Sequence, residues 1–231
     1  MNNNKLSKRL SACADFVPQG AHVADVGCDH GYLSIYLLQN GIASKVYAGD
    51  INEGPLQSAV LNAEKAGLKE RISFYLSDGV KNIPKDFDTL VCAGMGADTM
   101  ISILENAPWL QNKQYRLILQ CQSKIHCLRQ YLYEKGWHIV REKALKDGRF
   151  LYTVMEAVFE KTDYTAPRDY YFPPALLHCP TEELSAYYQQ TVQKLQRIAD
   201  GKKEHTDPVI LKALYQLDSE SLFQHLKEES H

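Results

Sequence analysis

The alternation of short apolar runs with helical patterns constrains the fold of this chain more than any other feature. Strands that alternate with helices are typical of βαβ units and a parallel sheet. The predicted strands are His22–Val26, Lys45–Gly49, Ile72–Leu76, Thr89–Ala93 and Arg116–Gln120. The predicted helices that follow strands are Tyr32–Asn40, Pro55–Ala66, Thr99–Asn106 and Ile125–Lys135. We therefore expect an α/β fold built around a parallel sheet.

The segments on either side of this alternation add three further elements. Apolar residues at helical spacing predict an amphipathic helix over residues 5–17. Two more predicted strands, Trp137–Ala144 and Phe150–Phe159, are joined only by residues 145–149. A link this short cannot form a crossover connection, so we expect this pair of strands to be antiparallel.

Residues 162–180 differ in composition from the rest of the chain, because four prolines stand among aromatic residues there. Beyond them, one helical pattern starts near Leu184 and ends at Gly201, and a second opens at Thr206-Asp207-Pro208. The short connection predicts an antiparallel, coiled-coil-like helical hairpin. We expect a ligand-binding domain over 1–161, a linker over 162–180 and the hairpin over 181–231.

Composition narrows the class of protein. The chain has 231 residues, a net charge of -2 and six cysteines. The cysteines are scattered without a Cys-x-x-Cys pair, which favours reduced thiols in a cytoplasmic protein with no metal site. No apolar stretch approaches the roughly 20 residues of a membrane span, and no signal-peptide region follows Met1. We expect a monomer or a weak homo-oligomer.

Charge is unevenly distributed along the chain. Residues 113–149 hold nine Lys or Arg against three Asp or Glu, whereas residues 161–231 hold eight against eleven. A basic patch on a nearly neutral protein suits selective contact with a polyanion. The alternative is a basic but merely solvated helix face.

Acid- or glycine-rich turns follow four consecutive predicted strands. They are Asp25-Val26-Gly27-Cys28-Asp29-His30-Gly31, Gly49-Asp50-Ile51-Asn52, Ser77-Asp78-Gly79 and Cys92-Ala93-Gly94-Met95-Gly96. The glycines let the backbone approach a ligand. Asp50 suits the ribose hydroxyls of a nucleoside, and Asp78 suits the exocyclic amine of an adenine. All four turns fall at the carboxyl ends of strands, where open α/β sheets bind ligands.

Two nucleoside cofactors compete for these turns. The nicotinamide dinucleotide fingerprint has a middle glycine where this chain has Asp29, and a third Gly or Ala where it has Ser34. A pyrophosphate is repelled by a carboxylate in its loop. S-adenosyl-L-methionine (AdoMet) carries positive charge and no phosphate, so the sequence favours AdoMet.

These residues resemble the bacterial tRNA (adenine-22-N1)-methyltransferase family, called TrmK. The resemblance rests on residues 6–10, the Asp25–Leu33 loop, Gly49–Leu56, Ser77–Gly79, Ala93–Gly96 and Leu128–Leu132. It covers nearly the whole chain and implies an AdoMet-dependent, Rossmann-like (class I) enzyme with a helical C-terminus. Five parallel strands followed by an antiparallel pair agree with a methyltransferase rather than a dehydrogenase. The implied reaction is bacterial tRNA modification that produces 1-methyladenosine at position 22.

The expected site residues follow from these motifs. For the cofactor we expect Asp25, Gly27, Cys28, Asp29, Gly31, Asp50, Ile51, Asp78, Gly79, Ala93, Gly94 and Met95. For the tRNA we expect Lys5, Lys8, Arg9, His30, Tyr32, Lys124 and Arg129. Asp29 is the candidate catalytic residue, because its carboxylate would stabilise the positive charge of a methylated adenine. Alternatively, Asp29 only binds the AdoMet ammonium or caps the next helix.

Two other functions compete with this reading. One is an AdoMet methyltransferase that acts on another RNA base or on a small amine. The other is a catalytically silent AdoMet-fold protein that binds RNA or a partner. The acids Asp25, Asp50 and Asp78 are intact, and a mere binding protein has no need of them.

Overall fold

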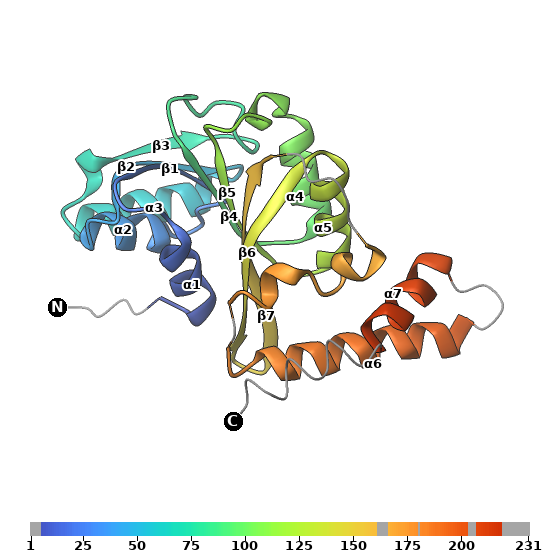
Figure 1. The fold of residues 1–231 in the computed structure, drawn as a ribbon. Helices are drawn as coiled ribbons and strands as arrows, with labels where there is room; N and C mark the ends of the chain where they lie inside the picture. Colours follow the sequence, from blue (N-terminus) through green and yellow to red (C-terminus); the bar gives the residue numbers. More distant parts are fainter. Residues whose placement is uncertain (1–5, 161–165, 180, 203–206, 219–231) are drawn as a thin grey trace.

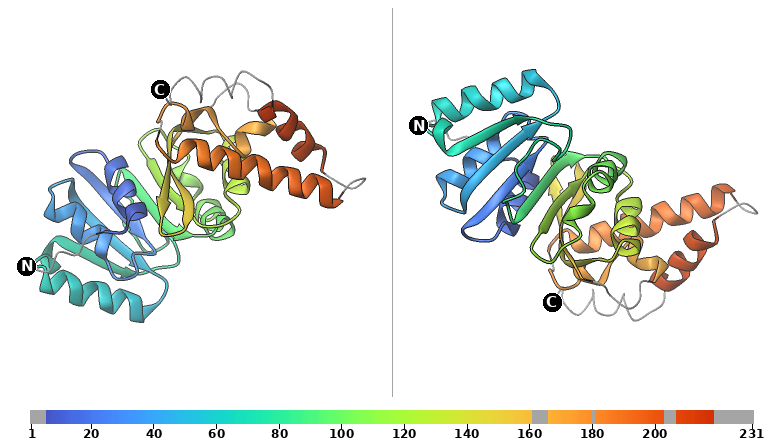
Figure 2. Two further views of the ribbon diagram at one scale, coloured as in Figure 1. Left: turned by 90° about the horizontal axis from the view of Figure 1, so that it is seen from below. Right: turned by 90° about the horizontal axis from the view of Figure 1, so that it is seen from above.

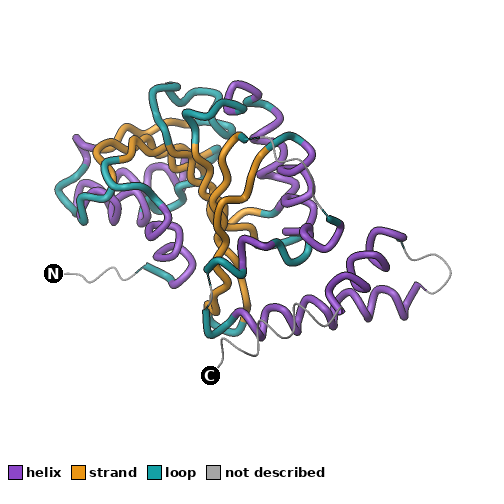
Figure 3. Tube along the Cα trace, in the orientation of Figure 1, coloured by secondary structure: helices purple, strands orange, loops and turns teal. Residues whose placement is uncertain are grey.

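A seven-stranded mixed sheet forms the centre of the protein (Figures 1 and 3). The computed structural model describes residues 6–160, 166–179, 181–202 and 207–218. The strands are β1 (Ala21–Val26), β2 (Ala43–Asp50), β3 (Ile72–Leu76), β4 (Thr89–Met95), β5 (Arg116–Cys121), β6 (Trp137–Asp147) and β7 (Phe150–Phe159). Their order is β3-β2-β1-β4-β5-β7-β6. The first five strands are parallel and β7 is antiparallel to both neighbours, as the sequence predicts.

The helices also match their predictions, apart from their ends. They are α1 (Lys8–Phe16), α2 (Tyr32–Gln39), α3 (Glu53–Lys65), α4 (Ala97–Glu105), α5 (Ile125–Glu134), α6 (Leu184–Lys202) and α7 (Pro208–Asp218). Helix α1 starts later than expected because Ser7 caps it, with its Oγ 3.4 Å from the Leu10 amide nitrogen. Helix α3 starts two residues before Pro55, since proline is tolerated in a first turn.

The sheet is buried on both faces, and alternate residues of a strand enter different cores. Leu90 and Cys92 of β4 pack in the core under α4 and α5, whereas Val91 between them packs in the core under α1, α2 and α3. This explains why the central strands are continuously apolar rather than alternating. Figure 1 shows the two helical layers on opposite faces of the sheet.

The strand order reverses between β1 and β4. Chain connections run outward from β1 through β2 to β3, and then from β4 outward through β5. Ligands of open α/β sheets bind where the carboxyl ends of strands flank such a switch point. The fold therefore directs attention to the turns after β1 and β4.

The C-terminal helices have a small core of their own. Phe172 and Leu176, in the predicted linker, are buried with Tyr188 of α6 and Leu217 of α7. The Tyr188 hydroxyl donates to the Leu217 carbonyl at 2.6 Å, so the end of α7 lies beside the start of α6 and the two helices are antiparallel. Ala144 of β6 belongs to the same core, which ties these helices to the sheet. Figure 2 shows α6 and α7 at the opposite end of the molecule from α2 and α3.

All six cysteines lie within the described residues and none forms a disulfide. Within the described ranges, no group of three or more His, Cys, Asp or Glu is placed to hold a metal ion. No described helix is both long enough and apolar enough to cross a membrane.

Candidate active site

The turns after β1, β2, β3 and β4 surround one cavity of about 410 Å³. Six expected cofactor residues line it: Gly27, Asp50, Ile51, Asp78, Gly79 and Met95. The cavity is lined by three carboxylates, those of Asp50, Asp78 and Asp98, and no Lys, Arg or His of the described chain is among its lining residues. Asp78 and Asp98 pair with lysines outside the lining, Lys81 and Lys124, whereas no ion pair within the described residues involves Asp50. We call this carboxylate-lined pocket the acidic cavity.

The loop after β1 bends because every second residue in it has a left-handed backbone conformation. Gly27, Asp29 and Gly31 have φ angles of 70°, 51° and 71°. The amides of Gly27 and Cys28 both donate to the Gly49 carbonyl, at 2.8 and 3.0 Å, which fastens the loop to β2. The left-handed conformation of Gly27 favours glycine, and a Cβ there would push aside the flexible end of Met95.

Asp50 connects the first two turns. Its Oδ2 accepts from the Asp29 amide at 3.1 Å and its Oδ1 accepts from the Asn52 amide at 2.9 Å. A carboxylate can accept about four hydrogen bonds, so both oxygens keep capacity for a ligand in the cavity. The predicted role of Asp50 on ribose hydroxyls stays a prediction.

Asp25 lies behind the cavity rather than in its wall. The Ser34 hydroxyl donates to Asp25 Oδ2 at 2.6 Å, and the carboxyl group is only 3% exposed. Burial raises the pKa of Asp25 to about 6, although the Ser34 hydrogen bond opposes this shift. Ser34, which departs from the dinucleotide fingerprint, thus supports a buried acid.

The turns after β3 and β4 complete the wall. Asp78 lines the cavity and forms an ion pair with Lys81 at 2.5 Å, while Gly79 packs against Ile103 of α4. Gly94 is held by the wholly buried Gln120, whose Oε1 accepts from the Gly94 amide at 3.1 Å. The side chain of Gln120 therefore fixes the turn that carries Met95.

The sequence did not predict the cavity residues of α4, which are the apolar Ile103 and three polar residues. Asp98, Thr99 and Ser102 also line the acidic cavity. They occupy one side of a short amphipathic helix, where polar residues resemble an ordinary solvated face. The only available signal was the position of α4 directly after the β4 turn.

Asp29 lies in the loop after β1 beside two of the expected substrate residues, His30 and Tyr32. Its side chain is 68% exposed, and Oδ1 is 3.6 Å from His30 Nε2. The rings of His30 and Tyr32 are 5.6 Å apart, and Tyr32 is 40% exposed, so it is not a core residue. These three side chains form an accessible polar and aromatic edge beside the cofactor loop.

Several expected cofactor residues do not line the cavity: Asp25, Cys28, Asp29, Gly31, Ala93 and Gly94. Of these, Cys28 is buried, and Gly31 packs closely against Ala59 of α3. They shape the loops that carry the lining residues. Direct contact of these six with the cofactor stays a prediction.

The expected tRNA contacts divide into exposed and buried groups. Lys8 is exposed, and Arg9 reaches the β4 turn, where a Cβ built on Gly94 would lie 3.5 Å from Arg9 Nη1. Lys124 is exposed and pairs with Asp98 at 2.7 Å. Lys5 lies outside the described residues.

Arg129 is not the exposed side chain that the prediction of an RNA contact implies. This guanidinium is wholly buried and forms an ion pair with Glu142 at 2.6 Å. It also donates to the Tyr171 carbonyl at 2.7 Å and to the Tyr187 hydroxyl at 2.9 Å. These three partners belong to β6, the linker and α6, so the contacts of Arg129 hold these elements together. We call this set of contacts the Arg129 joint.

Comparison with known proteins agrees with this geometry. Residues 6–155 match the family described as methyltransferase domain. The chain is 39% identical over 158 residues to the Bacillus subtilis tRNA (adenine(22)-N(1))-methyltransferase, which covers 68% of this chain and 66% of that enzyme. A putative tRNA methyltransferase of Mycoplasma genitalium is 32% identical over 161 residues, covering 68% of this chain and 70% of that protein.

Solved structures cover almost the whole chain. A putative tRNA (m1A22) methyltransferase of Streptococcus pneumoniae, in complex with S-adenosyl-L-methionine, superimposes with a TM-score of 0.79 at 32% identity and covers 98% of this chain and 100% of that one. The B. subtilis m1A22 tRNA methyltransferase TrmK gives a TM-score of 0.77 at 31% identity and covers 97% and 98%. The chain belongs to the TrmK family of tRNA (adenine(22)-N(1))-methyltransferases.

Proposed function

We propose that this protein uses AdoMet to methylate N1 of adenine 22 in tRNA. The observation that carries the proposal is the acidic cavity at the switch point of the sheet, lined by the carboxylates of Asp50, Asp78 and Asp98. A cationic nucleoside cofactor suits this charge, whereas a pyrophosphate would be repelled by it. The tRNA substrate and a cytoplasmic location are part of the same proposal.

The residues of the cavity fit the parts of AdoMet. Asp50 keeps acceptor capacity for the ribose hydroxyls, and Asp78 offers an acceptor for the adenine amine. Ile51 is 63% exposed at the cavity edge, where it supplies an apolar surface for a purine ring. The bound cofactor supplies an electrophilic methyl group on a sulfonium.

We propose that Asp29 acts in the methyl-transfer step. Adenine N1 forms a bond to the methyl carbon while the carbon–sulfur bond breaks, and the adenine ring gains the positive charge that the sulfur loses. In-line positioning of N1 accounts for much of the rate. We infer that the Asp29 carboxylate, which is exposed and held by a left-handed backbone, stabilises this charge or accepts a proton from the exocyclic amine.

Methyl transfer to tRNA transcripts tests the proposed reaction. The protein is incubated with labelled AdoMet and unmodified transcripts that carry adenine or guanine at position 22. We expect labelling only of the adenine transcript. Equal labelling of both would support another RNA target, and no labelling with intact AdoMet binding would support the catalytically silent alternative.

The role of Asp29 needs a separate comparison. Loss of one charge-stabilising group commonly lowers kcat by roughly 10²–10³, so we expect Asp29→Ala to do so while AdoMet affinity stays within about twofold. Glu70→Ala is the matched control, because Glu70 is an exposed acid that does not line the acidic cavity. Equal losses of kcat and AdoMet affinity in Asp29→Ala would assign Asp29 to cofactor binding instead.

We also propose a division of the chain into a catalytic domain over 1–161, a linker over 162–180 and a C-terminal hairpin over 181–231. The separate core of α6, α7 and the linker supports it. The Arg129 joint and Ala144 connect this core to the sheet. A monomer or weak homo-oligomer remains our expectation, which sedimentation of the full chain would test.

A further inference from the structure

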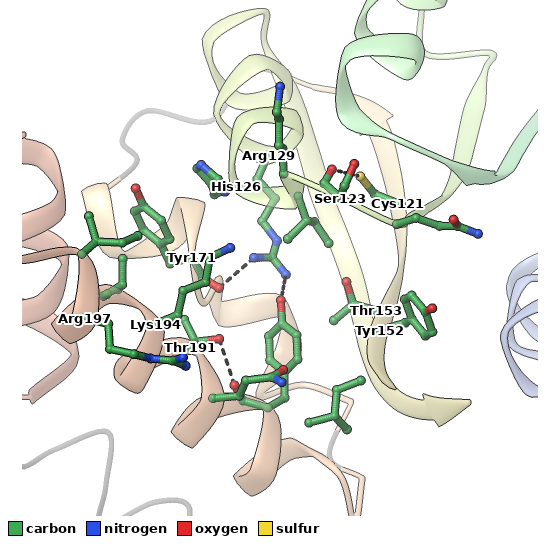
Figure 4. Close-up of a pocket in the computed structure, with 18 residues that line it drawn as sticks. Cys121, Ser123, His126, Arg129, Tyr152, Thr153, Tyr171, Thr191, Lys194 and Arg197 are labelled. Carbon is green, nitrogen blue, oxygen red and sulfur yellow. Dashed lines mark hydrogen bonds between the residues drawn. The ribbon is translucent and has the colours of Figure 1, made fainter. Parts of the chain in front are cut away.

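A second and larger cavity lies between the catalytic sheet and α6. Its volume is about 610 Å³, within the range of roughly 300–1,000 Å³ that is usual for ligand sites. The start of α5, strand β7, Tyr171 of the linker and one side of α6 form its walls (Figure 4). We call it the basic cavity, because it is lined by five basic side chains, those of Lys124, His126, Arg129, Lys194 and Arg197.

The charge of this cavity is of one sign. No Asp or Glu is among its lining residues in the described chain. Arg129 is neutralised by Glu142, and Lys124 pairs with Asp98 at the rim. Lys194 and Arg197 on α6 form no ion pair with any carboxylate in the described ranges, and both are exposed. Burial lowers the pKa of His126, and the charge of Lys194 lowers it further.

Helix α5 also directs its amino terminus into the basic cavity. The cavity is lined by Lys124, Ile125 and His126, and no side chain caps this helix. The first amides of a helix have no intrahelical partner and favour an anion. Together with Lys194 and Arg197, this end of α5 suits a phosphate group.

One buried hydroxyl in the wall has no partner. Thr153 of β7 lines the cavity and is only 1% exposed, and its Oγ1 makes no hydrogen bond within the described structure. A buried polar group without a partner is costly, and such groups in native structures call for an explanation. The oxygen is closed off from the cavity, so a ligand would become its partner only if the Thr153 side chain rotates toward the cavity.

The lining also offers flat aromatic surfaces. The rings of His126 and Tyr171 are stacked, with centroids 5.1 Å apart and planes at 13°, and Tyr152 lies across the cavity from them (Figure 4). Aromatic rings beside positive charge are typical of sites for single-stranded nucleic acid. Phosphate and base recognition are thus both available in one cavity.

The basic cavity shares a wall with the acidic cavity. The Gln122 amide donates to the Met95 carbonyl at 2.8 Å, and the Ala97 amide donates to the Ser123 carbonyl at 3.1 Å. Met95 lines the acidic cavity, while Gln122 and Ser123 line the basic one. A polynucleotide strand with one base at Met95 has its next nucleotides within reach of the basic cavity.

We propose that the basic cavity binds one nucleotide of the substrate RNA next to the target adenine, with its phosphate at Lys194, Arg197 and the start of α5. This inference rests on the proposed function for the identity of the RNA. The base lies among the aromatic rings, and a polar group of the nucleotide reaches Thr153.

Charge removal on α6 tests the phosphate contacts. The variants are Lys194→Gln, Arg197→Gln and their double, with Lys212→Gln on the exposed side of α7 as the matched control. We expect the double variant to weaken tRNA binding by roughly tenfold to a hundredfold and to lower the salt slope of log Kd by about 0.7–0.9 per contact. We expect KM for tRNA to rise while kcat and AdoMet affinity stay within about twofold. Binding equal to that of Lys212→Gln would overturn the proposal.

Thr153→Val adds a measurement, KM for tRNA, that would not change if Thr153 had only a structural role. Valine has nearly the shape of threonine and removes only the unpartnered hydroxyl, so we expect the Tm to stay level or rise. If the nucleotide uses this hydroxyl, KM for tRNA rises by roughly threefold to tenfold despite the unchanged stability. An unchanged KM would overturn the assignment of Thr153.

The binding assay separates this inference from the proposed function. It measures tRNA affinity without any methyl transfer. A wild-type protein that binds tRNA but does not label adenine 22 would contradict the proposed reaction and still allow the α6 variants to be judged. A wild-type protein that does not bind tRNA would overturn the basic cavity as an RNA site.

Discussion

The acidic and basic cavities are neighbours with opposite charge and opposite construction. The acidic cavity is lined by Asp50, Asp78 and Asp98 and arises from turns after consecutive strands of one sheet, together with α4. The basic cavity is lined by residues from 121 to 198, and its walls meet because α6 packs against β6 and is joined to α5 by the Arg129–Tyr187 hydrogen bond. One cavity is therefore encoded by local motifs and the other by tertiary packing.

This difference separates two kinds of recognition. A small cationic cofactor suits a pocket whose glycine turns and carboxylates are fixed by neighbouring backbone. A long anionic strand needs positive charge spread over surfaces that are distant in sequence. The shared wall at Gln122 and Ser123 keeps the two cavities adjacent.

The largest expected effect is at Arg129, the joint that holds the basic cavity together. Arg129→Met leaves Glu142 charged and buried without its partner, which typically costs about 3–5 kcal/mol. It also removes the donors to the Tyr171 carbonyl and the Tyr187 hydroxyl. We expect the free energy of unfolding in urea to fall by that amount.

The double variant Arg129→Met/Glu142→Gln is the control for this prediction. Because it removes both charges, we expect it to recover a large part of the lost stability. If the single and double variants were equally unstable, the buried charge would not be the cause. The loss would then come from the linker and α6 contacts.

The sequence predicted the acidic cavity well because its signals are local. A strand and the turn that ends it are adjacent in the chain, so Gly27, Asp50, Asp78 and Met95 were expected where the structure has them. Asp98 and Ser102 were not predicted, because polar residues on an amphipathic helix resemble a solvated face. Their exposure to the cavity depends on where α4 packs, which spacing does not encode.

Arg129 shows why the basic cavity was harder to predict from the sequence. Its neighbours in the sequence suggested a surface helix in a basic segment. Its partners Glu142 and Tyr187 are 13 and 58 residues away and belong to other elements. Nothing in the local pattern distinguishes a buried arginine with distant partners from an exposed arginine that contacts RNA.

A smaller effect is expected from the buried acid behind the acidic cavity. The pKa of Asp25 is raised from 3.8 to about 6 by burial. Because the folded carboxyl binds its proton more tightly than the unfolded one, it favours folding below about pH 4, and this contribution is lost as the pH rises through 6. Two pKa units correspond to about 3 kcal/mol.

Asp25→Asn removes this titration. We expect the stability of the variant relative to wild type to rise by up to about 3 kcal/mol between pH 4 and pH 7, in denaturation without cofactor. Ser34→Ala should shift the wild-type transition to higher pH, because the Ser34 hydrogen bond lowers the pKa of Asp25. Parallel pH profiles for wild type and Asp25→Asn would contradict the buried-acid interpretation.

The smallest effect, and the most selective, is expected at Gly27. Gly27→Ala and Gly41→Ala both place a side chain in the left-handed region, at φ angles of 70° and 64°, which costs about 1–2 kcal/mol of stability. A Cβ at Gly41 meets nothing within 4 Å, whereas a Cβ at Gly27 displaces the flexible end of Met95, a residue that lines the acidic cavity. Calorimetry should therefore show similar stability losses in the two variants but weaker AdoMet binding, by roughly tenfold, only in Gly27→Ala. Equal AdoMet affinity in both would mean that Met95 moves without entering the cofactor site, and the close contact between the β1 and β4 turns would then serve packing alone.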